Sequence, residues 1–368
     1  MRKPLLPGLA AAALLVAVVV TPATASEGAV LRAASPWAVP GSYLVKLKPG
    51  ATAPVAADRV FTGGFSTRLT AREARRLAAH PAVEYVEQDQ YVHALSTQPD
   101  APWGLDRTDQ RALPLDTTYS YTSTGATTSV YVVDTGIRTT HEEFGGRAFH
   151  GWDAVDNDPV AQDDNGHGTH VAGTIAGRTY GVAKGVDVYG VRVLNGSGSG
   201  TISGVIAGVD WVAAHARKPA VANFSLGGGA STALDDAVRR LIASGVTASV
   251  TAGSSGSGTV NTSPARVAEA ITSGATTSTD ARASFSNYGS GVDLFAPGVG
   301  IKSAWHTSDT ATNTLSGTSM ATGFVSGVAV RFLQFNPTAT PAQVHAELVR
   351  EATPLPWGGK LLYWSPSR

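Results

Sequence analysis

Short apolar runs alternate with longer amphipathic segments over most of the chain after residue 103. Between these runs, apolar residues recur at helical spacing, and Gly245 stands where one helix would end. The predicted strands are 129–136, 187–194, 220–227 and 246–253, and the predicted helices are 166–177, 203–217, 233–245 and 316–335. Strands that alternate with helices in this way predict an α/β domain with a mostly parallel sheet covered on both faces.

A different pattern precedes this region. Residues 42–48 alternate as a strand does, and residues 65–92 read as strand, helix and strand. Thr70 can cap the helix, with Glu73 as its capping-box partner. We therefore predict a separate small α+β domain, which ends near the Pro- and Gly-containing stretch after His93.

The first residues have the features of an export signal. Arg2 and Lys3 precede an apolar run from Leu9 to Val20, and the small residues Ala-Thr-Ala follow at 23–25. The run is shorter than the roughly 20 residues that a membrane-spanning helix needs. We predict a signal peptide at 1–25, a propeptide at 26–95, a mature domain at 96–368, and a secreted, extracellular product.

Composition narrows the possible partners. The 368 residues carry 28 basic and 28 acidic side chains, so no electrostatic attraction to nucleic acid or to an anionic membrane is expected. There is no cysteine, which excludes disulfides and thiol chemistry. An exported protein without disulfides needs another source of stability, and bound metal is one candidate.

Three motifs that can carry chemistry occur in a fixed order. Asp134 ends a predicted strand in VVDTG, His167 begins a predicted helix in DDNGHGTHVAG, and Ser319 begins another in SGTSMA. A carboxylate can orient a histidine, and that histidine can take the proton of a serine hydroxyl. Each motif alone has a structural explanation, and His167 with His170 could be a metal pair, but no third ligand lies nearby. The order Asp, His, Ser excludes an α/β-hydrolase, which needs Ser, Asp, His.

The chain resembles the subtilisin-like serine proteases, and most closely their proteinase K-like branch. The resemblance rests on APWGLDRTDQ, VYVVDTGI, DDNGHGTHVAGTIAG, NFSLGGG, ASFSNYGSGVDLFAPG and LSGTSMAT, and on residues 42–92, which resemble an inhibitory propeptide. It implies a three-layer subtilisin-like fold and a serine endopeptidase. By matching motifs, Ser319 is the nucleophile, His167 the general base and then acid, and Asp134 the orienting carboxylate.

One departure from the family pattern concerns the oxyanion site. The family reads AAGN where this chain reads TAGS, so Ser254 occupies the position of a catalytic Asn. In subtilisin, loss of this Asn donor reduces turnover by about 10²–10³. Gly323 and Phe324 also replace a Pro and a His of the family. We expect a protease of reduced activity; the alternative is an inactive subtilisin-like scaffold that binds peptides or a partner.

The resemblance also implies where a substrate binds. Ser225, Leu226 and Gly227 form one wall of the pocket for the P1 residue, Thr251, Ala252 and Gly253 form the other, and Gly198, Ser199 and Gly200 pair with the extended substrate. None of these residues is charged, so we expect apolar or aromatic P1 residues. The expected partners are protein or peptide substrates and the chain's own propeptide as an intramolecular inhibitor. We expect cleavage after Leu95, and a monomeric mature form without nucleic-acid or membrane partners.

Calcium (Ca2+) is the expected structural cofactor. Asp106, Asp109, Gln110 and Asp116 place several hard oxygen atoms in one loop, which suits this ion, although turn-forming residues would give the same pattern. Family resemblance adds a second site at Asp293, with the carbonyl groups of Ala268 and Ala270. The stretch with Asp156, Asp158 and Asp163 is a weaker third candidate.

Overall fold

The computed structural model describes residues 26–367 except 34, 36 and 93. The predicted signal peptide lies outside these residues. The chain forms two compact units, and the division between them falls between Tyr91 and Val92.

The first unit is a small sheet with one helix. Its strands lie in the order β1-β5-β2-β4-β3, and β1 pairs in parallel with β5 while the other pairs are antiparallel. The elements are β1 (Val30–Leu31), β2 (Ala38–Leu47), β3 (Arg59–Phe61), β4 (Gly64–Arg68), α1 (Ala71–Ala78) and β5 (Val83–Gln90). Thr70 and Glu73 form the predicted capping box at the start of α1.

The second unit is built on a nine-stranded sheet with the order β19-β20-β16-β15-β13-β11-β8-β10-β9. All the strand pairs in it are parallel except β19 with β20. Its strands are β8 (Ser129–Asp134), β9 (Ala148–Asp153), β10 (Asp187–Arg192), β11 (Ala220–Phe224), β13 (Thr247–Thr251), β15 (Ile271–Thr276), β16 (Leu294–Pro297), β19 (Thr353–Pro354) and β20 (Lys360–Leu361). The predicted parallel sheet is confirmed.

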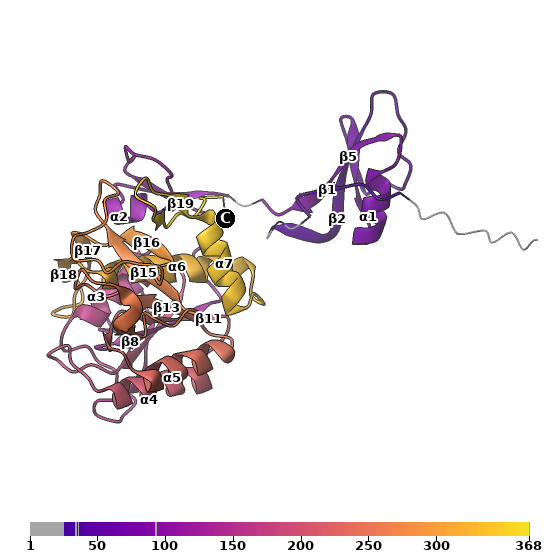
Figure 1. Ribbon diagram of the computed structural model, residues 1–368. Helices are drawn as coiled ribbons and strands as arrows, with labels where there is room; N and C mark the ends of the chain where they lie inside the picture. Colours follow the sequence, from indigo (N-terminus) through magenta and orange to yellow (C-terminus); the bar gives the residue numbers. More distant parts are fainter. Residues whose placement is uncertain (1–25, 34, 36, 93, 368) are drawn as a thin grey trace, which may run out of the picture. The chain divides into compact units, whose positions relative to one another are not determined.

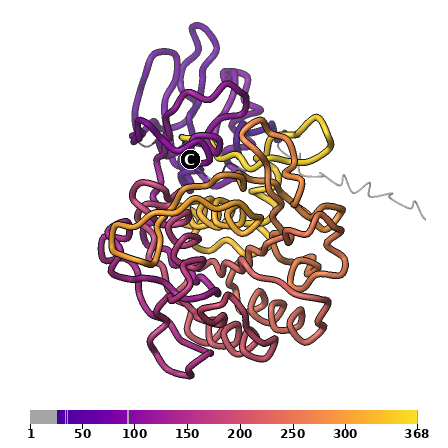
Figure 2. Tube along the Cα trace, turned by 90° about the vertical axis from the view of Figure 1, so that its left-hand side faces the viewer, coloured from indigo at the N-terminus to yellow at the C-terminus, as the bar shows by residue number. Residues whose placement is uncertain are grey.

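Helices cover both faces of this sheet. They are α2 (Trp103–Asp106), α3 (His167–Ala176), α4 (Ile202–His215), α5 (Thr232–Ala243), α6 (Thr318–Phe335) and α7 (Pro341–Glu351), with short 3₁₀ helices η1 (Glu142–Phe144) and η2 (Thr259–Asn261). Figure 1 shows α4 and α5 together below the sheet and α6 and α7 on its other side, and Figure 2 shows α4 and α5 at the lower edge of this unit. Smaller strand pairs complete the unit: β6 (Ser96–Pro99) with β7 (Thr118–Tyr121), β12 (Gly228–Gly229) with β14 (Thr262–Ser263), and β17 (Ile301–Ala304) with β18 (Thr312–Leu315).

Alternation of side chains along β8 explains the three layers. Val130 and Val132 belong to the core that includes α3, α6 and α7, whereas Tyr131 and Val133 belong to the core that includes α4 and α5. Every residue of β8 is buried, as expected for a central parallel strand. The carboxyl ends of the parallel strands therefore share one edge, where Asp134 is placed.

Individual residues at the helix ends explain where the helices begin and end. Gly245 has φ +93°, a left-handed conformation that terminates α5 without the strain of a side chain. Thr340 and Gln343 form a capping box on α7, and Pro341 is its first residue. None of the helices in the described part of the chain is both long enough and apolar enough to cross a membrane.

Candidate active site

Asp134 is the last residue of β8 and is fully buried. Its Oδ1 accepts a hydrogen bond from the backbone N–H of Thr135 at 2.8 Å and one from Nδ1 of His167 at 2.7 Å. The second bond orients the imidazole and leaves its Nε2 directed away from the carboxylate. This is the arrangement that a histidine needs to act as a base.

His167 begins α3, and Gly166 at the N-cap makes that start possible. Gly166 has φ +109°, and a Cβ there would lie 2.4 Å from Nδ1 of His306. Burial alone would lower the pKa of His167, but the charge of Asp134, their hydrogen bond and the charge of Asp163 raise it above the ordinary value. The site therefore favours the protonated imidazole, which is the form that results when the ring takes a proton from a hydroxyl group.

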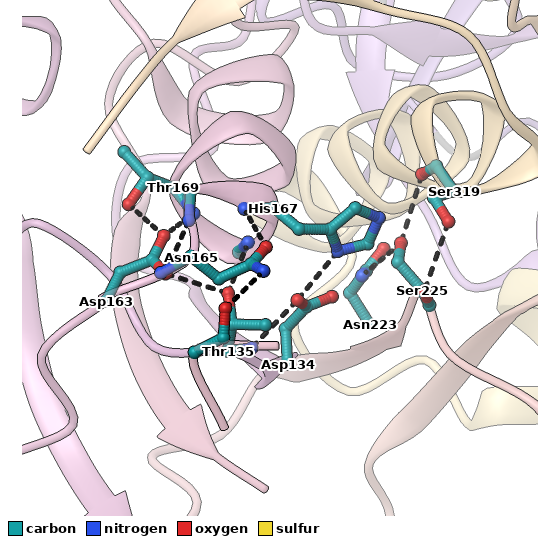
Figure 3. Close-up of polar contacts among 12 residues, drawn as sticks. Asp134, Thr135, Asp163, Asn165, His167, Thr169, Asn223, Ser225 and Ser319 are labelled. Atoms are coloured by element: carbon teal, nitrogen blue, oxygen red, sulfur yellow. Dashed lines mark hydrogen bonds and ion pairs between the residues drawn. The ribbon is translucent and has the colours of Figure 1, made fainter. Parts of the chain in front are cut away.

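Ser319 is the second residue of α6, close to the positive end of the helix dipole. Its hydroxyl donates to the carbonyl of Ser225 at 3.1 Å, and the hydroxyl of Ser225 donates to the carbonyl of Ser319 at 3.0 Å. Asn223 in turn donates to the hydroxyl of Ser225 at 2.9 Å. In the view of Figure 3, the ring of His167 lies between Asp134 and the pair formed by Ser225 and Ser319.

In this state the hydroxyl of Ser319 is therefore bonded to the end of β11 and not to His167. In enzymes without bound substrate, catalytic hydrogen bonds are often long or misaligned and tighten only when substrate is bound. The sequence did not indicate Asn223 or its own partner, Ser326, whose hydroxyl donates to Asn223 at 2.9 Å. Their contacts become visible only when β11 and α6 pack together.

Two adjoining pockets surround these side chains. One, of about 480 Å³, is lined by His167 and by the predicted residues Gly198, Ser199, Gly200, Ser225, Leu226 and Gly227. The other is lined by Ser319 and by Ser225, Leu226, Gly227, Thr251, Gly253 and Ser254. Ser225 to Gly228 form the wall that the pockets share. Ala252 is fully buried and lies behind the lining, where its carbonyl accepts a bond from Asn287.

The Gly- and Ser-rich stretch after Thr251 is held in place by Asn287, which the sequence did not single out. Its Nδ2 donates to the carbonyl of Ala252 at 2.8 Å, and its Oδ1 accepts from the N–H groups of Ser255 at 3.2 Å and Ser257 at 2.9 Å. Gly253 has φ +98°, and a Cβ there would lie 2.5 Å from Nδ2 of Asn287. The stretch is therefore one wall of the site and not a flexible linker.

Ser254 is bonded to the residue that precedes Ser319. Its hydroxyl oxygen accepts the N–H of Thr318 at 3.1 Å and lies 2.9 Å from the hydroxyl oxygen of Thr318. Thr251 donates to that same Thr318 hydroxyl at 2.6 Å. The three side chains thus form a connected set of hydroxyl groups beside the start of α6.

The two other departures from the family pattern are both buried in α6. A Cβ at Gly323 would lie 3.1 Å from Cγ2 of Thr174, so Gly323 brings α6 close to α3. The ring of Phe324 packs against Gly104, where a Cβ would lie 2.7 Å from the ring. Gly323 therefore influences the packing of α6 against α3, the helix that begins with His167, whereas Phe324 influences the packing of α6 against α2.

The first calcium candidate contains a carboxylate with an unpaired oxygen. Oδ2 of Asp109 accepts the N–H of Ser120 at 2.7 Å, while its buried Oδ1 has no partner among the described residues. Burial, with the nearby charges of Asp106 and Asp116, raises the pKa of Asp109 to about 7. Gln110 donates to both Asp106 and Asp116. A cation would satisfy the unpaired oxygen, so these side chains fit a hard ion such as calcium.

The other candidates differ from the first. Asp293 accepts the N–H of Thr272 at 2.8 Å and lies 3.2 Å from Nε2 of His345, a partner that the sequence did not indicate. Ala268 is exposed and Ala270 is buried. In the weaker third stretch, Asp156 pairs with Arg192 and Asp163 accepts the hydroxyl of Thr135, so both carboxylates already have partners. Across the described ranges, no three His, Asp or Glu side chains are close enough to hold a metal without further ligands.

Comparison with known proteins identifies the class. The subtilase family matches residues 125–362, and the peptidase inhibitor I9 family matches residues 57–95. The chain therefore belongs to the subtilase family of serine proteases and carries an inhibitor-type propeptide before its peptidase domain.

The similar proteins have consistent descriptions. The chain is 52% identical over 367 residues to an extracellular serine proteinase of Thermus sp. strain Rt41A, with 90% of each protein covered. It is 55% identical to alkaline serine exoprotease A of Vibrio alginolyticus over 79% of this chain and 55% of that protein. The crystal structure of a cold adapted subtilisin-like serine proteinase matches with a TM-score of 0.70 and 57% identity, and covers 72% of this chain and 98% of that one.

Proposed function

We propose that this chain is a secreted zymogen whose mature domain is a serine endopeptidase of the proteinase K-like branch. The observation that carries the proposal is the 2.7 Å bond from His167 to the buried carboxylate of Asp134 at the end of β8, together with the bond from Ser319 at the start of α6 to Ser225, the residue after β11. In the proposed mechanism, Ser319 attacks the peptide carbonyl and His167 takes its proton. His167 then protonates the leaving amine, and water hydrolyses the acyl-enzyme by the same steps.

Stabilisation of the oxyanion is where this chain should differ from its relatives. The N–H of Ser319 is one donor, since it lies at the start of α6. The second donor is a hydroxyl proton from the pair formed by Ser254 and Thr318. The serine side chain is shorter than that of asparagine, and one of the two hydroxyl protons is used in the bond between Ser254 and Thr318. We therefore propose reduced turnover compared with subtilases that have Asn at this position.

The pockets support an apolar or aromatic P1 residue, because the walls that adjoin Ser319 carry no charged side chain. Ser199 and its two neighbouring glycines present an edge on which an extended backbone can pair. The propeptide would occupy these subsites before maturation, with Val92 and Leu95 in the apolar pockets. We propose Ser96 as the first residue of the mature chain, and a monomer in the extracellular medium.

Calcium is proposed as a structural ion. The unpaired Oδ1 of Asp109 supports a site there, with Asp106, Asp116 and the Gln110 oxygen as further ligands. The second proposed site combines Asp293 with the Ala268 and Ala270 carbonyls, and calcium there would compete with His345 for the carboxylate. When bound, the ion neutralises carboxylate charge and stabilises these loops.

Labelling and hydrolysis together test the proposed activity. A sulfonyl fluoride should label Ser319 of the matured protein, and a fluorogenic peptide with Phe or Leu at P1 should be hydrolysed. Ser319→Ala should abolish both. If correctly folded, matured protein neither reacts nor hydrolyses, the protease proposal fails and the inactive scaffold that binds peptides becomes the better explanation.

A further inference from the structure

A second carboxylate, Asp163, is buried behind the pair formed by Asp134 and His167. Its side chain is 3% exposed, and it accepts five hydrogen bonds. The bonds to Oδ1 come from Thr135 Oγ1 at 2.8 Å, Asn165 N at 3.0 Å and Gly166 N at 2.8 Å, and those to Oδ2 come from Thr169 N at 2.9 Å and Thr169 Oγ1 at 2.5 Å. Figure 3 shows these side chains around Asp163.

These bonds connect the two elements that supply the catalytic pair. Thr135 directly follows Asp134 at the end of β8, and Thr169 lies in the first turn of α3, two residues after His167. The hydroxyl of Thr135 also accepts the N–H of Gly168 at 2.9 Å. One carboxylate therefore fixes the end of the strand against the start of the helix.

Capping of α3 does not account for this arrangement. The N-cap residue is Gly166, which has no side chain to cap the helix, so the single bond that the N–H of Thr169 donates to Oδ2 of Asp163 would suffice for that purpose. The bond from Thr135 instead crosses to another element. A carboxylate is also required for the whole set, because all five partners are donors and a neutral amide would present its own N–H groups to them.

We propose that Asp163 is a positioning residue for catalysis: it fixes Asp134 relative to His167 and places a second negative charge behind the imidazolium that forms during the reaction. This inference rests on the proposed protease function. The groups that act on the His167 ring are Asp134 on β8, Asp163 before α3 and His170 on α3. Burial lowers the pKa of His170 to about 4, so His170 is neutral where the enzyme would work.

The test uses Asp163→Asn in the full chain, matured by the protein itself. Asp235→Asn is the matched control, because Asp235 on α5 is also a buried carboxylate and its Oδ2 accepts a bond from Nε of Arg266 at 2.6 Å. For each protein, kcat and KM are measured across pH with the fluorogenic peptide, and folding is followed by thermal unfolding. Active-site labelling gives the concentration of competent enzyme.

We expect Asp163→Asn to lower kcat by about 10- to 100-fold with KM changed by less than about threefold, because misplacement affects the transition state most. The acidic limb of kcat/KM should shift to lower pH by a few tenths of a unit, since a negative charge near the imidazolium is lost. Asp235→Asn should have the same kcat as the natural enzyme and an acidic limb of kcat/KM at the same pH.

Two results would overturn the inference. One is a folded Asp163→Asn variant with unchanged kcat, and the other is a variant whose lower kcat comes with an unshifted acidic limb, which indicates a structural role only. If Asp163→Asn does not mature, Thr169→Val provides the test. This variant keeps the negative charge of Asp163 but removes the hydroxyl bond to it, so kcat should fall while the acidic limb of kcat/KM stays at the same pH. An unchanged kcat would refute the proposal. A silent natural enzyme would instead refute the proposed function itself, and this inference with it.

Discussion

The hydroxyl oxygen of Ser254 accepts the N–H of Thr318 at 3.1 Å and lies 2.9 Å from the hydroxyl oxygen of that same residue. Since Thr251 already donates to Thr318, the Ser254–Thr318 pair has two protons and uses one of them within the pair. Whichever hydroxyl donates inside the pair, one proton is left for another acceptor beside Ser319. Serine at this position therefore keeps a donor at the site and also holds the first N–H of α6.

Restoring the family's asparagine should raise turnover. We expect Ser254→Asn to increase kcat by up to about 100-fold with little change in KM, because an oxyanion donor acts mainly in the transition state. Hydrolysis of the Phe- or Leu-containing peptide by the natural protein, this variant and Ser319→Ala measures the effect. An unchanged or lower kcat in folded Ser254→Asn would show that the missing amide does not limit this enzyme.

Proton sharing predicts that losses at Ser254 and Thr318 are not additive. Ser254→Ala leaves the Thr318 proton available, and Thr318→Val leaves the Ser254 proton, so each single change should reduce kcat by less than about tenfold. The double variant loses both protons, so its kcat should fall by more than the product of the two single losses, within the total of about 10²–10³ that separates an enzyme with the asparagine donor from one with no donor. A double-mutant cycle on kcat measures the coupling, and simple additivity would contradict a shared proton.

Ser254→Ala should also destabilise the fold, because the N–H of Thr318 loses its acceptor. A loss of roughly 0.5–2 kcal/mol is expected, as for other helix-start acceptors. This loss must be measured beside kcat, so that unfolded protein is not mistaken for inactive enzyme.

The activity should depend on pH through His167. Catalysis needs the neutral ring, and the net effect of burial, Asp134 and Asp163 is a raised pKa. The acidic limb of kcat/KM should therefore have its midpoint above the ordinary histidine value of about 6.5. A limb centred below that value would contradict the raised pKa.

The contribution of His167 to the stability of the fold falls as pH rises, whereas its contribution to activity increases. Folding favours its protonated form, so this contribution is fully present below the unfolded pKa of about 6.5 and is lost as pH rises through the folded value. Thermal unfolding of sulfonyl fluoride-treated enzyme between pH 5 and pH 9 provides the comparison, because autolysis is then suppressed.

Removal of calcium should lower the melting temperature, and the loss should grow with pH. Without a cation, burial holds the pKa of Asp109 at about 7, well above the unfolded value of about 3.9. Its contribution to stability is then present below about 3.9 and lost as pH rises through about 7. Melting curves with excess chelator or calcium at several pH values measure this.

Asp109→Asn is the matched variant for the calcium prediction. It removes the charge that a cation would balance, so the difference between chelator and calcium should shrink. A melting temperature that does not respond to excess chelator would eliminate the calcium proposal at both sites.

Maturation should occur after Leu95. Val92 and Leu95 are 93% and 56% exposed, and an exposed segment can enter a protease site in extended form. N-terminal sequencing of the secreted protein should give Ser96. Leu95→Arg should slow processing because the proposed P1 pocket has no acidic wall, whereas Leu95→Phe should be processed normally; rapid processing of Leu95→Arg would contradict an apolar P1 preference.

The fold was largely predictable because its signals are local. The apolar runs gave the strands, helical spacing gave the helices, and the capping pair Thr70 and Glu73 placed α1 correctly. The motif around Asp134, His167 and Ser319 identified candidate residues, since their chemistry and order are properties of the sequence. The family match then supported the class of enzyme independently.

The sequence by itself determined the parallel α/β class, the pattern of an export signal and the candidate residues for acyl transfer. Only the tertiary structure placed Asp163 behind His167, Asn287 across the Gly- and Ser-rich wall, and Thr318 against Ser254. The physical reason is that these contacts join segments 28 to 64 residues apart in sequence or on different elements. Local periodicity specifies which face of an element is buried, but packing of the elements decides which polar groups meet at the sheet edge.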